Sequence, residues 1–289
     1  MGKEDIKLSG YSIIRRLGTG ARTVIYLAKE DATRNTVALK RAVAERPEDA
    51  RIFEQMEQEY EIARQIDSPY VRKCHRLLRI RSMLRTKELY LVMEWFDGMA
   101  LEDSPSLSIV DVLLVFRMVA NGLHAMHQRG FVHCDIKPNN ILFNPSGTVK
   151  IIDLGQSCRT GARKQRIQGT PDYIAPEQVR REPLDQRTDI FNLGATMYWA
   201  FTGKNVPTLI PKNDTLGMAM PASQFQSPHE IHRRIPIGIS KLIMDCVRER
   251  QADRPATMGD VMSRLDLLIH SILGPKMQNP KGGAVSNLQ

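Results

Sequence analysis

The stretch that decides the fold is His-Cys-Asp-Ile-Lys-Pro-Asn-Asn at residues 133–140, followed by Asp-Leu-Gly at residues 153–155. Between them, two apolar runs flank an Asn-Pro-Ser-Gly turn, a pattern that predicts a β-hairpin. Asn140 precedes this hairpin and Asp153 follows it, so we expect their side chains to lie side by side. Their oxygens suit Mg²⁺, which takes few protein ligands and completes its shell with phosphate oxygens. Asp135 is then a carboxylate beside a metal site, where a group that orients an attacking hydroxyl would lie.

Length and composition indicate an ordinary globular protein. With 289 residues, 42% apolar and 25% charged, the chain can form one two-lobed domain or two small domains. Four cysteines show no C-x-x-C spacing, so neither a zinc site nor a disulfide framework is indicated. We find no run of 18 apolar residues and no signal peptide, and therefore expect a cytoplasmic protein without a membrane span.

The net charge of +9 comes partly from residues 71–87, which hold seven Lys or Arg and no acidic residue. One interpretation is a surface for nucleic acid or an acidic partner. The other is a solvated strand–turn–strand face. We favour the second, because no aromatic residues are interleaved for base stacking, and we expect no specific nucleic-acid partner.

The N-terminal part predicts a glycine turn between two strands. Gly18 and Gly20 stand between apolar, β-branched residues, and glycines let backbone N–H groups approach phosphate closely. A plain hairpin is the alternative. A third strand at residues 37–40 ends at Lys40, whose side chain could also simply extend to solvent.

A helix is predicted from Pro47, since its fixed φ suits the first helical position. Glu59 falls inside the apolar stripe of this helix, and a buried carboxylate is costly unless it is paired. Lys40 is the natural partner; a rotated helix with Glu59 at its edge is the alternative. The stripe consists of Ile52, Met56, Tyr60, Ala63 and Ile66.

The pattern H-x-D-x-K-x-x-N followed by D-x-G resembles the catalytic core of eukaryotic-type protein kinases. Residues 169–177, Gly-Thr-Pro-Asp-Tyr-Ile-Ala-Pro-Glu, resemble the block that closes the activation segment of Ser/Thr kinases and are the most specific match. The resemblance covers residues 11–272. Within the family, the chain is similar to bacterial eukaryotic-like Ser/Thr kinases. The resemblance implies an α+β bilobal protein-kinase fold. We expect a small lobe at 11–94 with five antiparallel strands and one helix, a mainly helical large lobe at 97–272, a lead at 1–10 and a disordered tail at 273–289.

The resemblance implies transfer of the ATP γ-phosphoryl group to Ser or Thr hydroxyls of proteins, with Mg²⁺ as cofactor. The implied catalytic residues are Asp135, Lys137, Lys40 and Glu59, and the implied metal ligands are Asn140 and Asp153. We expect Asp135 and Lys40 to face a solvent-filled cleft. The implied ATP-binding residues are Leu17, Gly18, Gly20, Ile25, Ala38, Lys40, Met93, Glu94 and Phe96.

Three further pairings follow from the resemblance. Thr170 is expected to bond toward Asp135 and Lys137, Glu177 to pair with Arg254, and Asp189 to hold the backbone of the catalytic loop. A small-molecule kinase of the aminoglycoside type is disfavoured, because that class lacks the Ala-Pro-Glu block.

Two departures from the family pattern leave a second interpretation open. Thr23 replaces the third glycine and Cys134 replaces the Arg before the catalytic Asp, which motivates the alternative of a pseudokinase scaffold that binds ATP or partners without turnover. Without that Arg, the pocket for a phosphate on Ser157 or Thr160 has one fewer cation. We therefore expect that activity does not depend on phosphorylation of this segment. The basic residues of this segment are then expected to contact an acidic substrate or partner: Arg159, Arg163, Lys164 and Arg166.

Overall fold

The computed structural model describes residues 8–20, 22–44, 46, 49–82, 85–104, 107–210 and 225–277. The chain forms two compact units, Met1–Met99 with Leu142–Ser157 and Ala100–Ile141 with Cys158–Gln289. The sequence predicted one division between residues 94 and 97, whereas the structure assigns the hairpin and the Asp-Leu-Gly segment to the first unit. The predicted helix start at Pro47 and most of the predicted tail lie outside the described residues.

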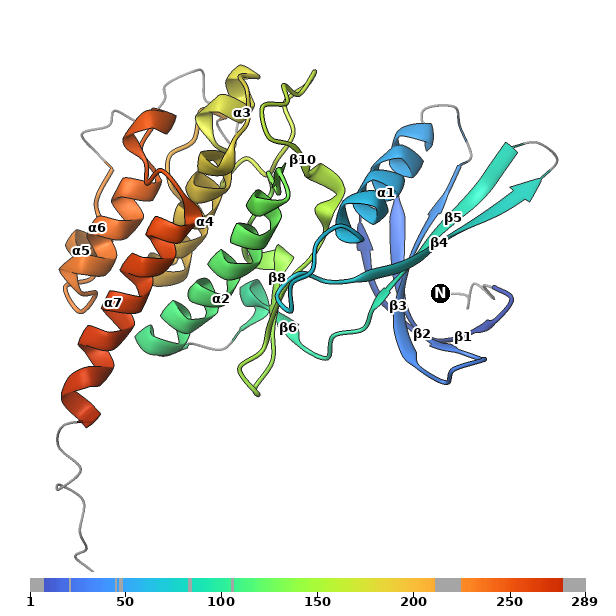
Figure 1. The fold of residues 1–289 in the computed structure, drawn as a ribbon, viewed down its shortest axis with the longest axis horizontal. Coiled ribbons are helices and arrows are strands. Elements are labelled where there is room, and N and C mark those ends of the chain that lie inside the picture. The colour runs from blue at the N-terminus through green and yellow to red at the C-terminus, as the bar shows by residue number, and fades with distance from the viewer. Residues whose placement is uncertain are drawn as a thin grey trace, which may run out of the picture. The chain divides into compact units, whose positions relative to one another are not determined.

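The first unit contains the predicted antiparallel sheet, with strand order β1-β2-β3-β5-β4 (Figure 1). One face buries a cluster that includes Tyr26, Leu39 and Val92, and the other buries Ala38, Leu91 and Met93. Alternate residues of β3 thus enter two separate cores, as the two-residue period of a strand requires. The strands are β1 (Tyr11–Gly20), β2 (Thr23–Glu30), β3 (Thr36–Val43), β4 (Cys74–Ser82) and β5 (Arg85–Glu94).

Helix α1 (Ala50–Ala63) packs on one face of this sheet through Met56, which joins the core of Ala38, Leu91 and Met93. The predicted stripe is confirmed in outline: Met56 and Ala63 are buried, and Glu59 is buried beside them. The helix ends three residues before Ile66, which is nevertheless buried.

The predicted hairpin is formed by β8 (Ile141–Phe143) and β9 (Val149–Ile151), with Gly147 at a positive φ in the turn. A short parallel bridge joins Val71 to Ile151. The 3₁₀ turn η4 (Leu154–Gln156) then contacts α1. These contacts explain why this segment belongs to the first unit.

The second unit is mainly helical (Figure 1). In its core, α4 and α7 contact each other, and α2 and α6 each contact both of them. Asp185 caps α4 by accepting a hydrogen bond from the Arg187 N–H. α7 continues past residue 273, where the sequence predicted a disordered tail to begin. The elements are β6 (Met99–Ala100), η2 (Leu101–Asp103), α2 (Ile109–Gln128), β7 (Phe131–Val132), η3 (Pro138–Asn140), β10 (Cys158–Arg159), α3 (Pro176–Arg180), α4 (Gln186–Thr202), α5 (Pro228–Ile231), α6 (Ile237–Cys246), η6 (Gln251–Asp253) and α7 (Met258–Met277).

Helix α2 is long and apolar enough to cross a membrane by length and composition alone. Half of that window is buried inside the unit, and α2 packs extensively on α7. A buried core helix passes the same test, so this feature is weak support for a membrane span.

Candidate active site

The first unit holds a cluster of charges around Lys40, near the middle of β3. The Lys40 ammonium lies 2.7 Å from Glu59 Oε2 and 3.2 Å from Asp153 Oδ1. Burial by itself lowers the pKa of Lys40, but the carboxylates of Glu59 and Asp153 outweigh it and raise that pKa above its ordinary value. Lys40 therefore carries a positive charge at neutral pH, beside the two carboxylates.

The Lys40–Glu59 pair predicted from the helical stripe is present, but it is more enclosed than the sequence suggested. The Lys40 side chain is 13% exposed and that of Glu59 only 2%. The alternative of a Lys40 side chain that simply extends to solvent is therefore disfavoured, because α1 and β3 enclose the pair, and its position in a cleft stays a prediction.

Arg72 belongs to this charge cluster, and the sequence analysis missed it. Its Nη2 lies 3.9 Å from Glu59 Oε1, and its side chain is buried. Glu59 therefore faces two cations. Arg72 had been grouped with the exposed basic stretch, and no local pattern marks it as buried. Its position is fixed by its backbone N–H, which donates to the Ile151 carbonyl at 3.0 Å.

Apolar residues expected to hold a nucleotide base gather on one face of the sheet. Ala38 pairs with Met93 across β3 and β5, and both are buried. Leu17 and Ile25 pack against the same cluster. Farther along the chain, Phe96 is buried, and Glu94 bonds through its carboxylate with Lys150 at 2.8 Å.

The glycine turn follows the register of β1 and β2. Gly18 pairs with Ile25 and Gly20 pairs with Thr23. A Cβ on Gly18 would meet nothing within 4 Å, whereas a Cβ on Gly20 would lie 2.7 Å from Thr23 Oγ1. Thr23, one of the two residues that depart from the kinase pattern, is buried. Its side chain therefore fills space beside Gly20 that a glycine would leave open.

The second unit holds a hydrogen-bonded cluster around Asp135. Lys137 Nζ lies 2.9 Å from Asp135 Oδ2 and donates to Thr170 Oγ1 at 2.8 Å. The Thr170 hydroxyl in turn donates to Asp135 Oδ1 at 2.8 Å. Asn140 Nδ2 donates to the Asp135 carbonyl at 2.8 Å and to Oδ2 at 3.2 Å. This network holds the Asp135 carboxylate in one orientation and contains the predicted Thr170 contacts.

Asp189, fully buried in α4, positions the backbone of this loop. Its Oδ2 accepts from the His133 N–H at 2.9 Å and its Oδ1 from the Cys134 N–H at 2.8 Å, as predicted. His127 Nε2 lies 2.7 Å from the same carboxylate, a contact that the sequence analysis did not identify. Cys134 has a φ of 67°, an uncommon conformation for a residue other than glycine. These backbone hydrogen bonds help to hold it there.

The predicted Glu177–Arg254 pair is also present. The Arg254 guanidinium donates to both oxygens of Glu177, at 2.8 and 2.9 Å, and neither side chain is exposed by more than 1%. Such a bidentate, desolvated pair fixes the end of the activation segment to the C-terminal helical region.

A family model described as the protein kinase domain matches residues 11–264. The chain belongs to the protein kinase domain family. Its predicted α+β kinase fold is thereby confirmed, with the antiparallel sheet in the first unit and the helices in the second.

Several curated serine/threonine-protein kinases are similar to this kinase domain. Serine/threonine-protein kinase A of Synechocystis sp. is 28% identical over 292 residues, which cover 93% of this chain and 55% of that protein. Serine/threonine-protein kinase Pkn1 of Myxococcus xanthus is 27% identical over 97% of this chain and 41% of that protein. Serine/threonine-protein kinase pak-2 of Caenorhabditis elegans is 28% identical over 81% of this chain and 44% of that protein. The chain thus spans about half the length, or less, of these relatives.

The activation segment of this kinase domain begins with one buried and one exposed hydroxyl. Ser157 is completely buried, and its carbonyl accepts a hydrogen bond from Gln58 of α1. Thr160 is exposed, and its N–H donates to the Gly130 carbonyl. Of the two residues considered for phosphorylation, only Thr160 is therefore accessible.

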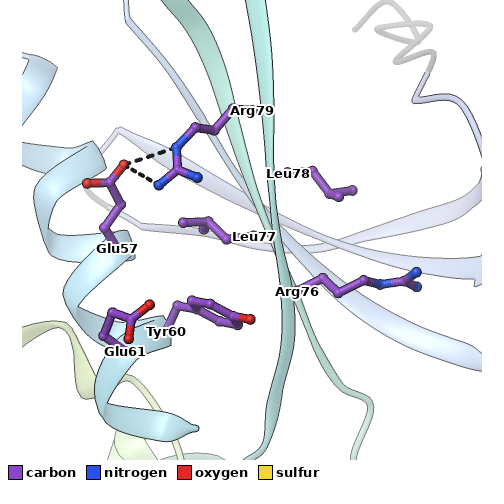
Figure 2. A pocket seen from close by; sticks show the side chains of 7 residues that line it. All are labelled: Glu57, Tyr60, Glu61, Arg76, Leu77, Leu78 and Arg79. Atoms are coloured by element: carbon purple, nitrogen blue, oxygen red, sulfur yellow. Dashed lines mark hydrogen bonds and ion pairs between the residues drawn. The ribbon is translucent and has the colours of Figure 1, made fainter.

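Three of the seven basic residues at 71–87 form side-chain ion pairs within the first unit. Figure 2 shows Arg79 of β4 pointing toward Glu57 of α1, and their ion pair has a length of 2.9 Å. Arg76 pairs with Glu30 and lies over the Tyr11 ring. Arg72, buried beside Glu59, is a correction to the predicted solvated face, and the expected lack of a specific nucleic-acid partner stays a prediction.

Proposed function

We propose that this chain is a Ser/Thr protein kinase that transfers the γ-phosphoryl group of ATP to a hydroxyl of a protein. The observation that carries the proposal is the three-way contact among Asp135, Lys137 and Thr170. Held by the other two residues, the Asp135 carboxylate orients the substrate hydroxyl and accepts its proton. Lys137 offsets negative charge on the group in transfer. Lys137, two residues after Asp135, matches the Ser/Thr type of the family.

The proposed ATP site uses residues of the first unit. Protein kinases use ATP and typically Mg²⁺. Lys40, held by Glu59, contacts the α- and β-phosphates, and the N–H groups near Gly18 and Gly20 approach the phosphates. The base lies among Leu17, Ile25, Ala38 and Met93, next to the backbone of Glu94 and Phe96.

The proposed Mg²⁺ ligands are Asn140 and Asp153. The Asn140 amide nitrogen donates two hydrogen bonds, which assigns the amide oxygen as the atom left for a cation. Asp153 offers a carboxylate that is 42% exposed beside Lys40. One amide oxygen and one carboxylate, completed by phosphate oxygens, fit the hard-ligand preference of Mg²⁺. The two residues belong to different units, and their juxtaposition stays a prediction.

The alternative is a pseudokinase scaffold, favoured by Thr23 and Cys134. The test is incubation with labelled ATP, Mg²⁺ and a generic Ser/Thr protein substrate, followed by phosphosite mapping. We expect phosphate on Ser or Thr and none with Asp135→Asn. Binding of ATP, seen as a thermal shift, without any Asp135-dependent transfer would favour the scaffold.

We further propose that activity does not depend on activation-segment phosphorylation. Cys134 offers only a weak donor where a guanidinium would bind phosphate. Ser157 is buried, which leaves Thr160 as the accessible hydroxyl of the pair. Phosphatase treatment and Thr160→Ala should each leave kcat/KM within about tenfold of the untreated protein, or 1.4 kcal/mol of transition-state stabilisation. A larger loss in either experiment would contradict the proposal.

An acidic substrate is the proposed preference. The Arg159 side chain already has partners within the second unit: its guanidinium carbon lies 4.1 Å from the Phe131 ring centre, and its Nη1 donates to the Arg129 carbonyl. Arg163 and Arg166 are exposed, and neither forms an ion pair with the part of the chain that the structure describes. Peptides with acidic flanks should show higher kcat/KM than neutral ones, and Arg163→Ala/Arg166→Ala should reduce that difference. A cytoplasmic location, supported by four free cysteines, completes the proposal.

A further inference from the structure

We propose that Cys134 and Cys158 form a reversible disulfide that suppresses phosphoryl transfer. Their sulfur atoms lie 3.6 Å apart, although 24 residues separate them in the chain. Neither cysteine has a role in the proposed transfer chemistry. Both belong to the second unit, one directly before Asp135 and the other at the start of β10.

The local fold brings these two thiols together and encloses them. Cys158 pairs with Val132 in the short β7–β10 ladder, so the chain two residues beyond Val132 reaches the Cys158 side chain. Val132 and Leu184 complete a small apolar cluster around the sulfurs. Since an S–S bond is about 2.0 Å long, roughly 1.5 Å of closure would join them.

The two thiols differ in reactivity. The hydrogen bond from Cys134 and the positive charge of Lys164 lower the pKa of the Cys158 thiol, whereas the pKa of Cys134 is raised. Cys158 is also the more exposed, at 7% against 1%. Cys158 is therefore the thiol that would meet an oxidant first, because the thiolate is the reactive form.

The proposed oxidant is a peroxide. The Cys158 thiolate attacks one peroxide oxygen of H₂O₂, the O–O bond breaks, and the products are a sulfenic acid and, after proton uptake, water. The Cys134 sulfur then attacks the sulfenic sulfur, loses its proton and displaces a second water as the S–S bond forms. Two thiols are oxidised by two electrons and one H₂O₂ is reduced to two H₂O. A dithiol reductant reverses the reaction by exchange.

Closure of this disulfide would strain the catalytic loop. The Cys134 N–H is held by Asp189 and its carbonyl accepts from Gln178 Nε2 at 2.8 Å, so its backbone is fixed on both sides. Any part of the closure that rotation of the two side chains does not supply must therefore displace the loop that carries Asp135 or pull β10 away from β7. Either change disturbs the network that orients the Asp135 carboxylate, and we expect kcat to fall.

The experiment uses the full chain with Cys74→Ala and Cys246→Ala, which leaves only the proposed pair. The protein is treated with H₂O₂, alkylated, digested without reductant and mapped by mass spectrometry. We expect a peptide pair joined through Cys134 and Cys158, and a fall in kcat of at least about tenfold that dithiothreitol restores. Cys158→Ala should be active in the reduced state and lose little activity on peroxide treatment. If Cys158→Ala folds poorly, Cys158→Ser takes its place, with the same expected result. The same protein with all four cysteines is the matched control and should remain sensitive.

Two results would overturn the inference. One is the absence of the joined peptides when peroxide has consumed the thiols. The other is a fully joined protein whose kcat stays within about twofold of the reduced form, which would mean that the pair serves only packing. The effect on turnover rests on the proposed function, but the mapping does not. A reduced protein without any transfer would refute the kinase activity and the suppression together, while the mapping still decides whether the bond forms.

Discussion

Replacement of Arg254 by leucine should destabilise the second unit strongly. Arg254 donates to both Glu177 oxygens and to three backbone carbonyls, those of Arg187, Arg248 and Glu249. Arg254→Leu leaves the Glu177 carboxylate buried, with the Thr188 hydroxyl as its remaining hydrogen-bond donor in the described residues. Removing one partner of a buried ion pair costs about 3 to 5 kcal/mol, because the other charge stays desolvated.

This cost can be measured as a change in melting temperature. For a unit of about 150 to 250 residues, each 1 kcal/mol lowers Tm by roughly 2 to 4 °C, so we expect a fall of about 6 to 20 °C. Differential scanning calorimetry would follow the transition of the helical unit. Arg254→Lys should fall between the wild type and Arg254→Leu, since lysine keeps the charge but not the planar fork.

Arg250→Leu is the matched control, four residues away on the same segment. The Arg250 side chain is 77% exposed and its Nε lies 3.4 Å from Asp253 Oδ2, and such surface pairs contribute at most about 1 kcal/mol. Equal Tm values for Arg254→Leu and Arg250→Leu would refute the reasoning, because the argument depends on the difference in burial.

Four further predictions concern the proposed reaction. Asp135→Asn should lower kcat by at least about 100-fold with little change in Tm, because the amide cannot accept the hydroxyl proton; wild-type turnover would remove Asp135 from the mechanism. Glu59→Gln should lower kcat/KM for ATP about tenfold, which steady-state kinetics tests. Lys40→Met should in addition lower Tm, because among the described residues it leaves the buried Glu59 with only the more distant Arg72 as a cationic partner. Unchanged kinetics and an unchanged Tm would show that the pair is dispensable. Removal of Mg²⁺ by a chelator should abolish transfer and added Mg²⁺ should restore it, with persistent turnover as the contrary result.

Much of the fold and of the site could be predicted from local patterns. The apolar periodicity of α1 was sufficient to place Glu59 on its buried side and to name Lys40 as its partner. The Asn-Pro-Ser-Gly turn predicted the β8–β9 hairpin, because its residue types favour tight turns. The resemblance to kinases supplied the long-range pairs of Thr170 and Glu177, which no local pattern contains.

Other features depended on packing between distant segments. Arg72 and Ser157 stand in polar stretches that predict exposure, yet both are buried, because Ile151 and α1 pack against their backbones. Cys134 and Cys158 have no metal or disulfide spacing, and only the β7–β10 ladder brings their sulfurs together. The sequence by itself thus determined which elements form and which residue types carry the chemistry, since periodicity and turn propensity act over a few residues. Tertiary structure alone decided which charged and polar side chains are buried and which thiols meet, because those depend on contacts between segments that local sequence does not encode.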